Sequence, residues 1–151
     1  MIETRIGCSI REYFEHAGEP AFRDIEAEVI ADLAARPSIV LATGGGAVLR
    51  EENRRALRAG KRVVYLRATP DDLARRLSRD TTRPMLQVAD PRQRLRELFA
   101  QRDPLYRECA HFTVDTARKS VPMLVGLVSM QIDLAAGAEP PPGDPDARHD
   151  R

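Results

Sequence analysis

The most distinctive local feature of this sequence is a run of three glycines, Gly44, Gly45 and Gly46, which follows the short apolar segment 38–42 and Thr43. Consecutive glycines lose much backbone entropy on folding, which is tolerated where backbone amides approach a ligand closely or adopt a positive φ. The alternative is a tight turn between a strand and a helix that binds nothing. We favour a ligand contact, because the glycines follow a segment typical of a buried strand.

Two arginines supply the second kind of candidate chemistry. Arg23 lies three residues before Glu26 on an expected helix, so the carboxylate one turn later can orient its guanidinium. An oriented guanidinium binds a carboxylate or a phosphate through two parallel hydrogen bonds. Arg102, in QRDPLYRE, precedes a proline, where a side chain can turn out of the packing. Taken singly, each arginine is explained better as part of a solvated helix face.

A basic segment without helical periodicity lies between two expected helices, at about residues 79–89. Four arginines lie in or beside it: Arg75, Arg76, Arg79 and Arg83. Such a loop can be a lid whose arginines neutralise phosphate charge and exclude water during phosphoryl transfer. A basic surface loop without that role is an equally good interpretation. The histidines and the two cysteines have no triad or metal-ligand spacing, and we assign them no role.

The composition restricts the function classes. The 151 residues carry 24 Lys+Arg and 23 Asp+Glu, a formal net charge of +1, which argues against a strongly basic nucleic-acid-binding domain. No apolar run approaches the ~20 residues that a membrane span needs, and the N-terminus lacks the layout of a signal peptide. We expect a cytoplasmic monomer that acts on a small molecule, without nucleic-acid or membrane partners.

Alternating apolar segments and helical patterns position these residues. Short strands are expected at 38–42, 62–66 and 111–115. Helices are expected at about 10–17, 22–36, 51–59, 70–77, from 91 past Pro104, and 121–134. This alternation predicts an α/β fold, a parallel sheet with helices on both faces and ligands at the carboxyl ends of the strands. Residues 1–136 would form the domain, and the proline-rich segment 137–151 a disordered tail.

Six segments carry a family resemblance when they are taken together and in order. They read SIREYFEHAGEPAFRDIE, ATGGGAV, RVVYL, TTRPML, QRDPLYRE and FTVDT. The chain closely resembles shikimate kinase over about residues 2–134, and the combination of GEPAFRDIE, TGGG and RDPLY is the specific part. The resemblance implies a fold of the nucleoside-monophosphate-kinase type. It also implies ATP-dependent phosphorylation of the 3-hydroxyl of shikimate, with Mg²⁺, in aromatic amino-acid (chorismate) biosynthesis.

The resemblance further implies roles for individual residues. Arg23 and Arg102 correspond to the arginines that hold the shikimate carboxylate, and Glu26 would orient Arg23. Gly45, within the glycine run, lies where the family's backbone contacts the shikimate ring. On the nucleotide side, Arg83 corresponds to the lid arginine that reaches the ATP phosphates. The two residues at positions beside the adenine are Arg76 and Lys119.

One part of the family pattern is absent from the 151 residues. They contain no GxxxxGK(S/T) P-loop, which would wrap backbone amides around phosphates and place a lysine on them. The family's aspartate pair would fall immediately before Met1. We therefore expect an N-terminally shortened P-loop kinase that lacks its first strands and is impaired, and we assign no catalytic or metal-binding residue. A non-catalytic shikimate-binding remnant and a sugar-acid kinase of the gluconate type are the alternatives.

Overall fold

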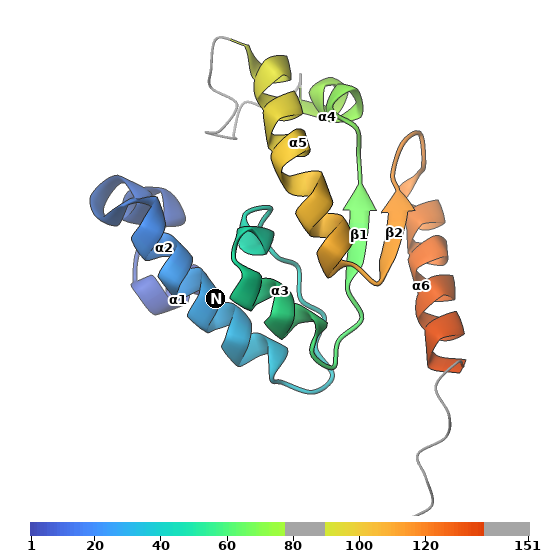
Figure 1. The fold of residues 1–151 in the computed structure, drawn as a ribbon, viewed down its shortest axis with the longest axis horizontal. Helices are drawn as coiled ribbons and strands as arrows, with labels where there is room; N and C mark the ends of the chain where they lie inside the picture. Colours follow the sequence, from blue (N-terminus) through green and yellow to red (C-terminus); the bar gives the residue numbers. More distant parts are fainter. Residues whose placement is uncertain (78–89, 138–151) are drawn as a thin grey trace, which may run out of the picture.

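The computed structural model describes residues 1–77 and 90–137 (Figure 1). In chain order the elements are α1 (Ile2–Ile6), α2 (Ile10–Ala34), the 3-10 turn η1 (Ala47–Leu49), α3 (Glu51–Arg58), β1 (Val64–Arg67), α4 (Pro70–Leu77), α5 (Pro91–Cys109), β2 (Phe112–Asp115) and α6 (Val121–Gly137). The expected lid with Arg79 and Arg83, and the expected tail beyond Gly137, lie outside the described residues.

Strands β1 and β2 form a parallel pair, in which Val64 lies opposite Phe112 and Arg67 lies opposite Asp115. Parallel strands need a long crossover connection, and here it runs through α4 and α5. Helix α5 lies beside β1, and α6 lies beside β2 on the other flank of the pair (Figure 1). The α/β class with parallel strands is thus confirmed.

The expected strand at 38–42 is wrong in this structure. Residues 39–44 are irregular, and the side chain of Val40 is 100% exposed. A strand needs a neighbour that satisfies its N–H and C=O groups, and within residues 1–77 and 90–137 the only pairing is that of β1 with β2. Composition alone indicated a strand, but no partner strand lies beside this segment in the part of the chain that the structure describes. The glycine run therefore follows an irregular segment.

Helix α2 contains the break that the sequence predicts at Gly18. The helix begins with a capping box, in which Ser9 Oγ accepts a hydrogen bond from the Glu12 amide and the Glu12 carboxylate accepts one from the Ser9 amide. Gly18 has φ 80° and ψ 170°, a backbone conformation that favours glycine. The second half of α2, which carries Arg23, therefore takes its own direction and ends at Ala34, two residues before the expected end at Arg36.

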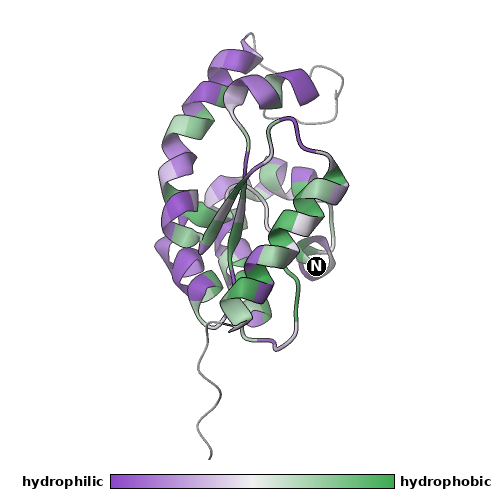
Figure 2. Ribbon diagram, turned by 90° about the vertical axis from the view of Figure 1, so that its right-hand side faces the viewer, coloured by the Kyte–Doolittle hydropathy of each residue, from purple (hydrophilic) through white to green (hydrophobic). Residues whose placement is uncertain are grey.

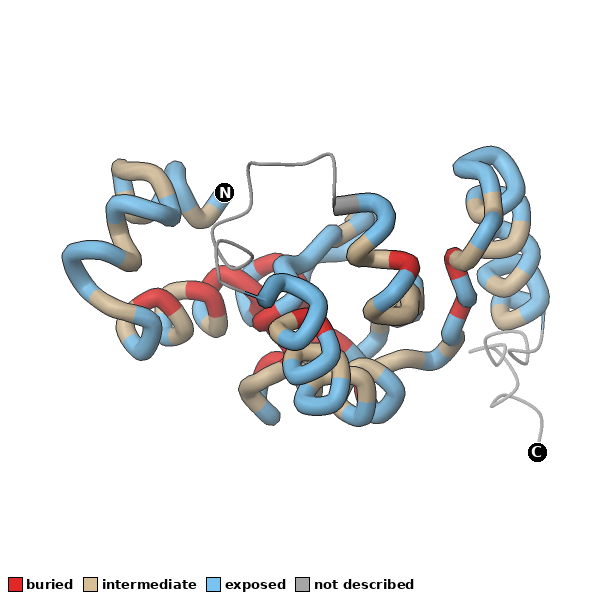
Figure 3. Tube along the Cα trace, turned by 90° about the horizontal axis from the view of Figure 1, so that it is seen from above, coloured by how far each residue is buried: buried red, intermediate tan, exposed pale blue. Residues whose placement is uncertain are grey.

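The main apolar core lies under the glycine run. Its buried members come from α2, η1, α3 and α5, and they are Ile30, Ala47, Val48, Leu57 and Cys109. Figure 3 shows these buried stretches meeting near the middle of the described chain. Asn53 of α3 is also buried, and its Nδ2 donates to the Ala47 carbonyl at 2.9 Å. Because η1 follows Gly46 directly, this core fixes one end of the glycine run.

The last helix is the most apolar element. Helix α6 extends to Gly137, three residues beyond the expected end, and Figure 2 shows it in mostly hydrophobic colours. Its apolar side chains are not buried in the described structure; Val121 is 73% and Met123 55% exposed. Among the described helices, none is both long enough and apolar enough to cross a membrane.

Candidate functional site

The guanidinium of Arg23 lies directly against the glycine run. A Cβ atom placed on Gly46 would overlap with both Nη atoms of Arg23, so the close approach depends on the absence of a side chain at Gly46. Gly46 itself is buried, whereas Gly44 and Gly45 are exposed. The glycine run therefore presents two exposed backbone units beside a side chain from α2.

Two carboxylates hold Arg23 in place. Its Nη1 donates to Oε2 of Glu26 at 2.6 Å, and its Nη2 donates to Oε1 of Glu19 at 2.9 Å. The Glu26 side chain is 5% exposed and that of Glu19 is 59% exposed. Burial acts to lower the pKa of Arg23, but the hydrogen bonds to Glu26 and Glu19 outweigh it and raise that pKa. The guanidinium is thus charged and oriented, as the spacing of Arg23 and Glu26 predicts.

Arg102 reaches the same run of glycines from α5. Its Nη1 lies 3.5 Å from the position that a Cβ on Gly45 would take. Its Nε atom is buried and has no hydrogen-bond partner within residues 1–77 and 90–137. A buried donor without a partner lowers the stability of the folded protein by roughly 1–3 kcal/mol. A hydrogen bond to a ligand would offset this cost. Because Gly45 and Gly46 are adjacent, the structure brings Arg23 and Arg102 to one short stretch of backbone.

Tyr106 is a residue of this site that sequence reasoning missed. Its hydroxyl donates to the Gly45 carbonyl at 2.6 Å. Its ring stacks on that of Tyr65, with 4.8 Å between centroids and 29° between planes. The signal that could have found it is its spacing of four residues from Arg102, which places both side chains on one face of α5.

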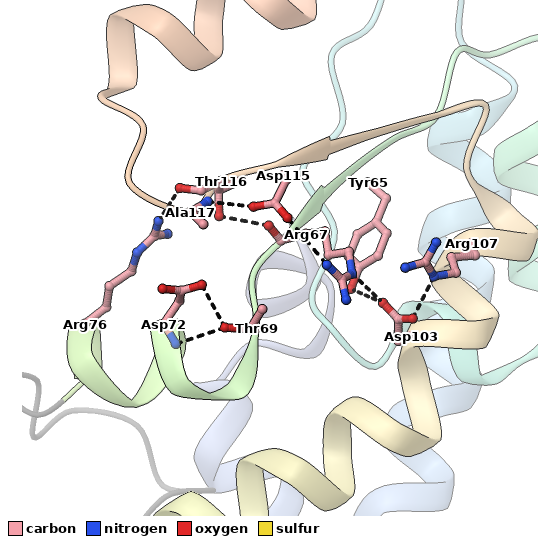
Figure 4. Close-up of polar contacts among 10 residues, drawn as sticks. All are labelled: Tyr65, Arg67, Thr69, Asp72, Arg76, Asp103, Arg107, Asp115, Thr116 and Ala117. Atoms are coloured by element: carbon pink, nitrogen blue, oxygen red, sulfur yellow. Dashed lines mark hydrogen bonds and ion pairs between the residues drawn. The ribbon is translucent and has the colours of Figure 1, made fainter.

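A partly buried carboxylate next to Arg102, that of Asp103, ties α5 to the end of β1 (Figure 4). Oδ1 of Asp103 accepts hydrogen bonds from the Tyr65 hydroxyl at 3.0 Å and from Nε of Arg67 at 3.3 Å, while Oδ2 accepts one from Nε of Arg107 at 2.7 Å. Burial acts to raise the pKa of Asp103, but the hydrogen bonds from Arg107 and the other donors lower it overall. The turn of α5 that carries Arg102 is therefore fixed by three donors.

The two residues predicted beside the adenine meet at Thr116. Nη2 of Arg76 donates to the Thr116 carbonyl at 2.8 Å (Figure 4). The backbone amide of Lys119 donates to the same oxygen at 3.4 Å. Thr116 is buried, and its Oγ1 donates to the Arg67 carbonyl at 3.0 Å. The structure thus brings Arg76 and Lys119 together beyond the ends of β1 and β2. Arg83 lies outside the described residues.

A cavity lies beside the glycine run. A cavity of about 340 Å³ borders Glu26 and Gly44, with an otherwise largely apolar lining, but neither Arg23 nor Arg102 lines it. In the described part of the chain, no group of three His, Cys, Asp or Glu side chains could hold a metal ion.

Comparisons with known proteins agree on one family. The family model described as shikimate kinase matches residues 1–131. The chain is 54% identical over 134 residues to a shikimate kinase of Burkholderia thailandensis, covering 89% of this chain and 73% of the relative. It is 52% identical over 140 residues to a shikimate kinase of Ralstonia nicotianae, covering 93% and 74%.

Solved structures give the same result. The structure of a shikimate kinase from Acinetobacter baumannii in complex with shikimate matches with a TM-score of 0.80 and 40% identity, over 91% of this chain and 76% of that one. A shikimate kinase structure from Aquifex aeolicus matches with a TM-score of 0.72 and 26% identity, over 90% and 79%.

Proposed function

The chain belongs to the shikimate kinase family, and on that premise we propose that Arg23, Arg102 and the glycine run bind shikimate for phosphorylation of its 3-hydroxyl by ATP. The observation that carries the proposal is the pair of arginines that converge on Gly45 and Gly46. Glu26 orients one guanidinium, and the other has a buried Nε without a partner in the described structure.

The chemistry of the two arginines matches a carboxylate. A carboxylate has two oxygens that accept parallel hydrogen bonds from a guanidinium, and such charge-assisted bonds are roughly twice as strong as neutral ones. On Arg102, the proposed donors to the shikimate carboxylate are at the Nη end of the guanidinium, where Nη1 lies 3.5 Å from the position of a Cβ on Gly45. Gly44 and Gly45 leave exposed backbone groups beside this guanidinium, which suit the ring hydroxyls as hydrogen-bond partners.

On the nucleotide side, Arg76 and Lys119 are proposed to lie beside the adenine, and Arg83 to contact the phosphates. Transfer moves the γ-phosphoryl group to the 3-hydroxyl oxygen of shikimate, breaks the bond between the γ-phosphorus and the bridging oxygen, and releases ADP and a proton. This reaction depends mainly on positioning and on stabilisation of phosphate charge. Mg²⁺, when bound with ATP, supplies further charge neutralisation at the phosphates. On the acceptor side, the chain's contribution is to hold shikimate through Arg23, Arg102 and the glycine run.

We also propose that the 151 residues phosphorylate shikimate slowly. The sequence contains no GxxxxGK(S/T) motif, which would supply the amides and the lysine that cradle ATP phosphates. Binding of shikimate, in contrast, depends on side chains that are present. We further propose a cytoplasmic monomer that acts on this small molecule without nucleic-acid or membrane partners.

Calorimetry with matched ligands tests this function. Shikimate should bind, and its methyl ester, which lacks the negative charge, should bind at least about 10-fold more weakly, as expected for loss of charge-assisted hydrogen bonds. ADP formation with Mg-ATP should then be measured with shikimate and with gluconate. Failure of shikimate to bind would overturn the proposal, and faster turnover of gluconate would favour a sugar-acid kinase.

A further inference from the structure

We propose that Tyr106 is a positioning residue of the shikimate site, whose hydroxyl fixes the orientation of the peptide group between Gly45 and Gly46. This role rests on the proposed binding of shikimate at the same glycines. Tyr106 acts through the backbone, because its hydroxyl donates to the Gly45 carbonyl.

The geometry of the hydrogen bond supports this role. The distance of 2.6 Å between the Tyr106 hydroxyl and the Gly45 oxygen is at the short end of the usual range for O–H···O bonds. A trans peptide group is planar, so its C=O and N–H point in opposite directions. A fixed Gly45 carbonyl therefore also fixes the direction of the Gly46 N–H. Glycines have no side chains that could restrict this peptide otherwise.

Tyr106 is itself held firmly enough to impose an orientation. Its ring stacks on Tyr65, whose hydroxyl donates to Asp103 at 3.0 Å, and it packs against the buried core cluster. Tyr106 and Arg102 lie one turn apart on α5. Their polar ends lie close to the same side of Gly45, at 3.0 and 3.5 Å from the position that a Cβ on Gly45 would take. One helix face thus presents both a cation for the ligand and a donor for the glycines.

The test compares Tyr106→Phe, which keeps the ring and removes only the hydroxyl, with Tyr13→Phe on α2 as the matched control. Loss of one neutral hydrogen bond should weaken shikimate binding by about 3- to 10-fold, and Tyr13→Phe should leave it unchanged. Tyr106→Phe should weaken the methyl ester by the same factor, because the hydroxyl does not act on the carboxylate. The amide NMR signal of Gly46 should shift, while those of α3 stay in place.

Three results would overturn the role of Tyr106. The first is that Tyr106→Phe binds shikimate within twofold of the wild-type affinity, and the second is that its Gly46 amide signal does not shift. The third is weaker binding together with shifted amide signals throughout α3 and a melting temperature lower by more than about 5 °C. The last pattern would identify a purely structural residue. If the unaltered chain fails to bind shikimate, the proposed function fails, while the Gly46 amide still reports whether the hydroxyl orients the peptide group.

Discussion

Arg23 and Glu26 form an ion pair in which both side chains are largely buried. The Nη1 and Oε2 atoms are 2.6 Å apart, and the two side chains are 14% and 5% exposed. No other ion pair in the described part of the chain has so little solvent exposure on both sides. A buried carboxylate in this position does more than balance charge, because it fixes the plane of the guanidinium that faces Gly46.

Replacement of Glu26 by glutamine should therefore weaken shikimate binding by about 10-fold and lower the free energy of unfolding by about 1–3 kcal/mol, because a hydrogen bond to a buried charge is lost. The control is Glu19→Gln, since the Glu19 side chain is 59% exposed and contributes little in water. Calorimetry and urea denaturation measure both effects. Equal losses for the two variants would contradict the role of Glu26.

Truncation of either arginine should affect shikimate far more than ATP. We expect Arg23→Ala and Arg102→Ala each to weaken shikimate binding by about 10- to 100-fold, the range for charge-assisted hydrogen bonds, in a chain that binds both ligands. Arg11→Ala is the control, because Arg11 is 77% exposed on α2. Equal losses for shikimate and ATP would indicate misfolding rather than a damaged carboxylate site.

The first and last glycines of the run, Gly44 and Gly46, should differ sharply in their tolerance of a methyl group. In Gly46→Ala the new Cβ overlaps with the guanidinium of Arg23, which must swing away, whereas in Gly44→Ala the nearest atom, Oε1 of Glu26, is 3.7 Å away. We expect Gly46→Ala to lose at least 10-fold in shikimate affinity, because the oriented hydrogen bonds of Arg23 are lost. Gly44→Ala should lose less than about threefold. Similar affinities for the two variants would show that Arg23 does not depend on Gly46.

Local signals predicted most of the helices. The capping box of Ser9 and Glu12, the proline after Thr69 and the proline after Asp90 are each contained within a few residues, and each starts a helix where expected. The strand at 38–42 was wrong because a strand depends on a partner elsewhere in the chain. An apolar composition indicates that a segment can be buried, but it does not indicate which strand, if any, pairs with that segment.

In the site, too, contacts within one helix could be predicted from the sequence, whereas contacts between distant segments could not. The spacing of Arg23 and Glu26 on one helix predicted their ion pair, and the family resemblance predicted that Arg102 joins them. The contact of Tyr106 with Gly45 and that of Tyr65 with Asp103 connect segments far apart in the sequence. The helical spacing places Tyr106 on the same face of α5 as Arg102, but it does not specify these contacts, since they depend on how α5 packs against β1 and the glycines.

Acid should destabilise the protein through His111. Its Nδ1 accepts a hydrogen bond from the Val63 amide at 3.0 Å, so the ring is neutral, and burial together with Arg58 and Arg62 lowers its pKa below the ordinary 6.5. As the pH falls below about 6.5, the unfolded chain takes up the proton first and stability decreases. Urea denaturation from pH 7.5 to 5.5 should show a smaller decrease for His111→Asn than for the wild type. His16→Asn, an exposed change on α2, should keep the wild-type slope.

Deletion of residues 137–151 should leave stability and binding unchanged. Their proline-rich composition with few apolar residues offers little surface to bury, and we propose that residues 1–136 suffice as the domain. The melting temperature should stay within about 2 °C, since a change of 1 kcal/mol corresponds to about 2–8 °C for domains of roughly this size. A decrease of several degrees would mean that the segment docks on the domain.

The site exists only once α2 and α5 have both packed around η1, because Arg23 comes from one helix and Arg102 from the other. An unfolded chain cannot hold these two side chains against the same glycines, so shikimate bound at the proposed site would bind the native state alone. A ligand that binds only the native state raises the free energy of unfolding by mass action. At a shikimate concentration of 100 times Kd the increase would be about 2.7 kcal/mol. A cell rich in shikimate would therefore protect this protein from proteolysis, and a block that depletes shikimate would shorten its lifetime.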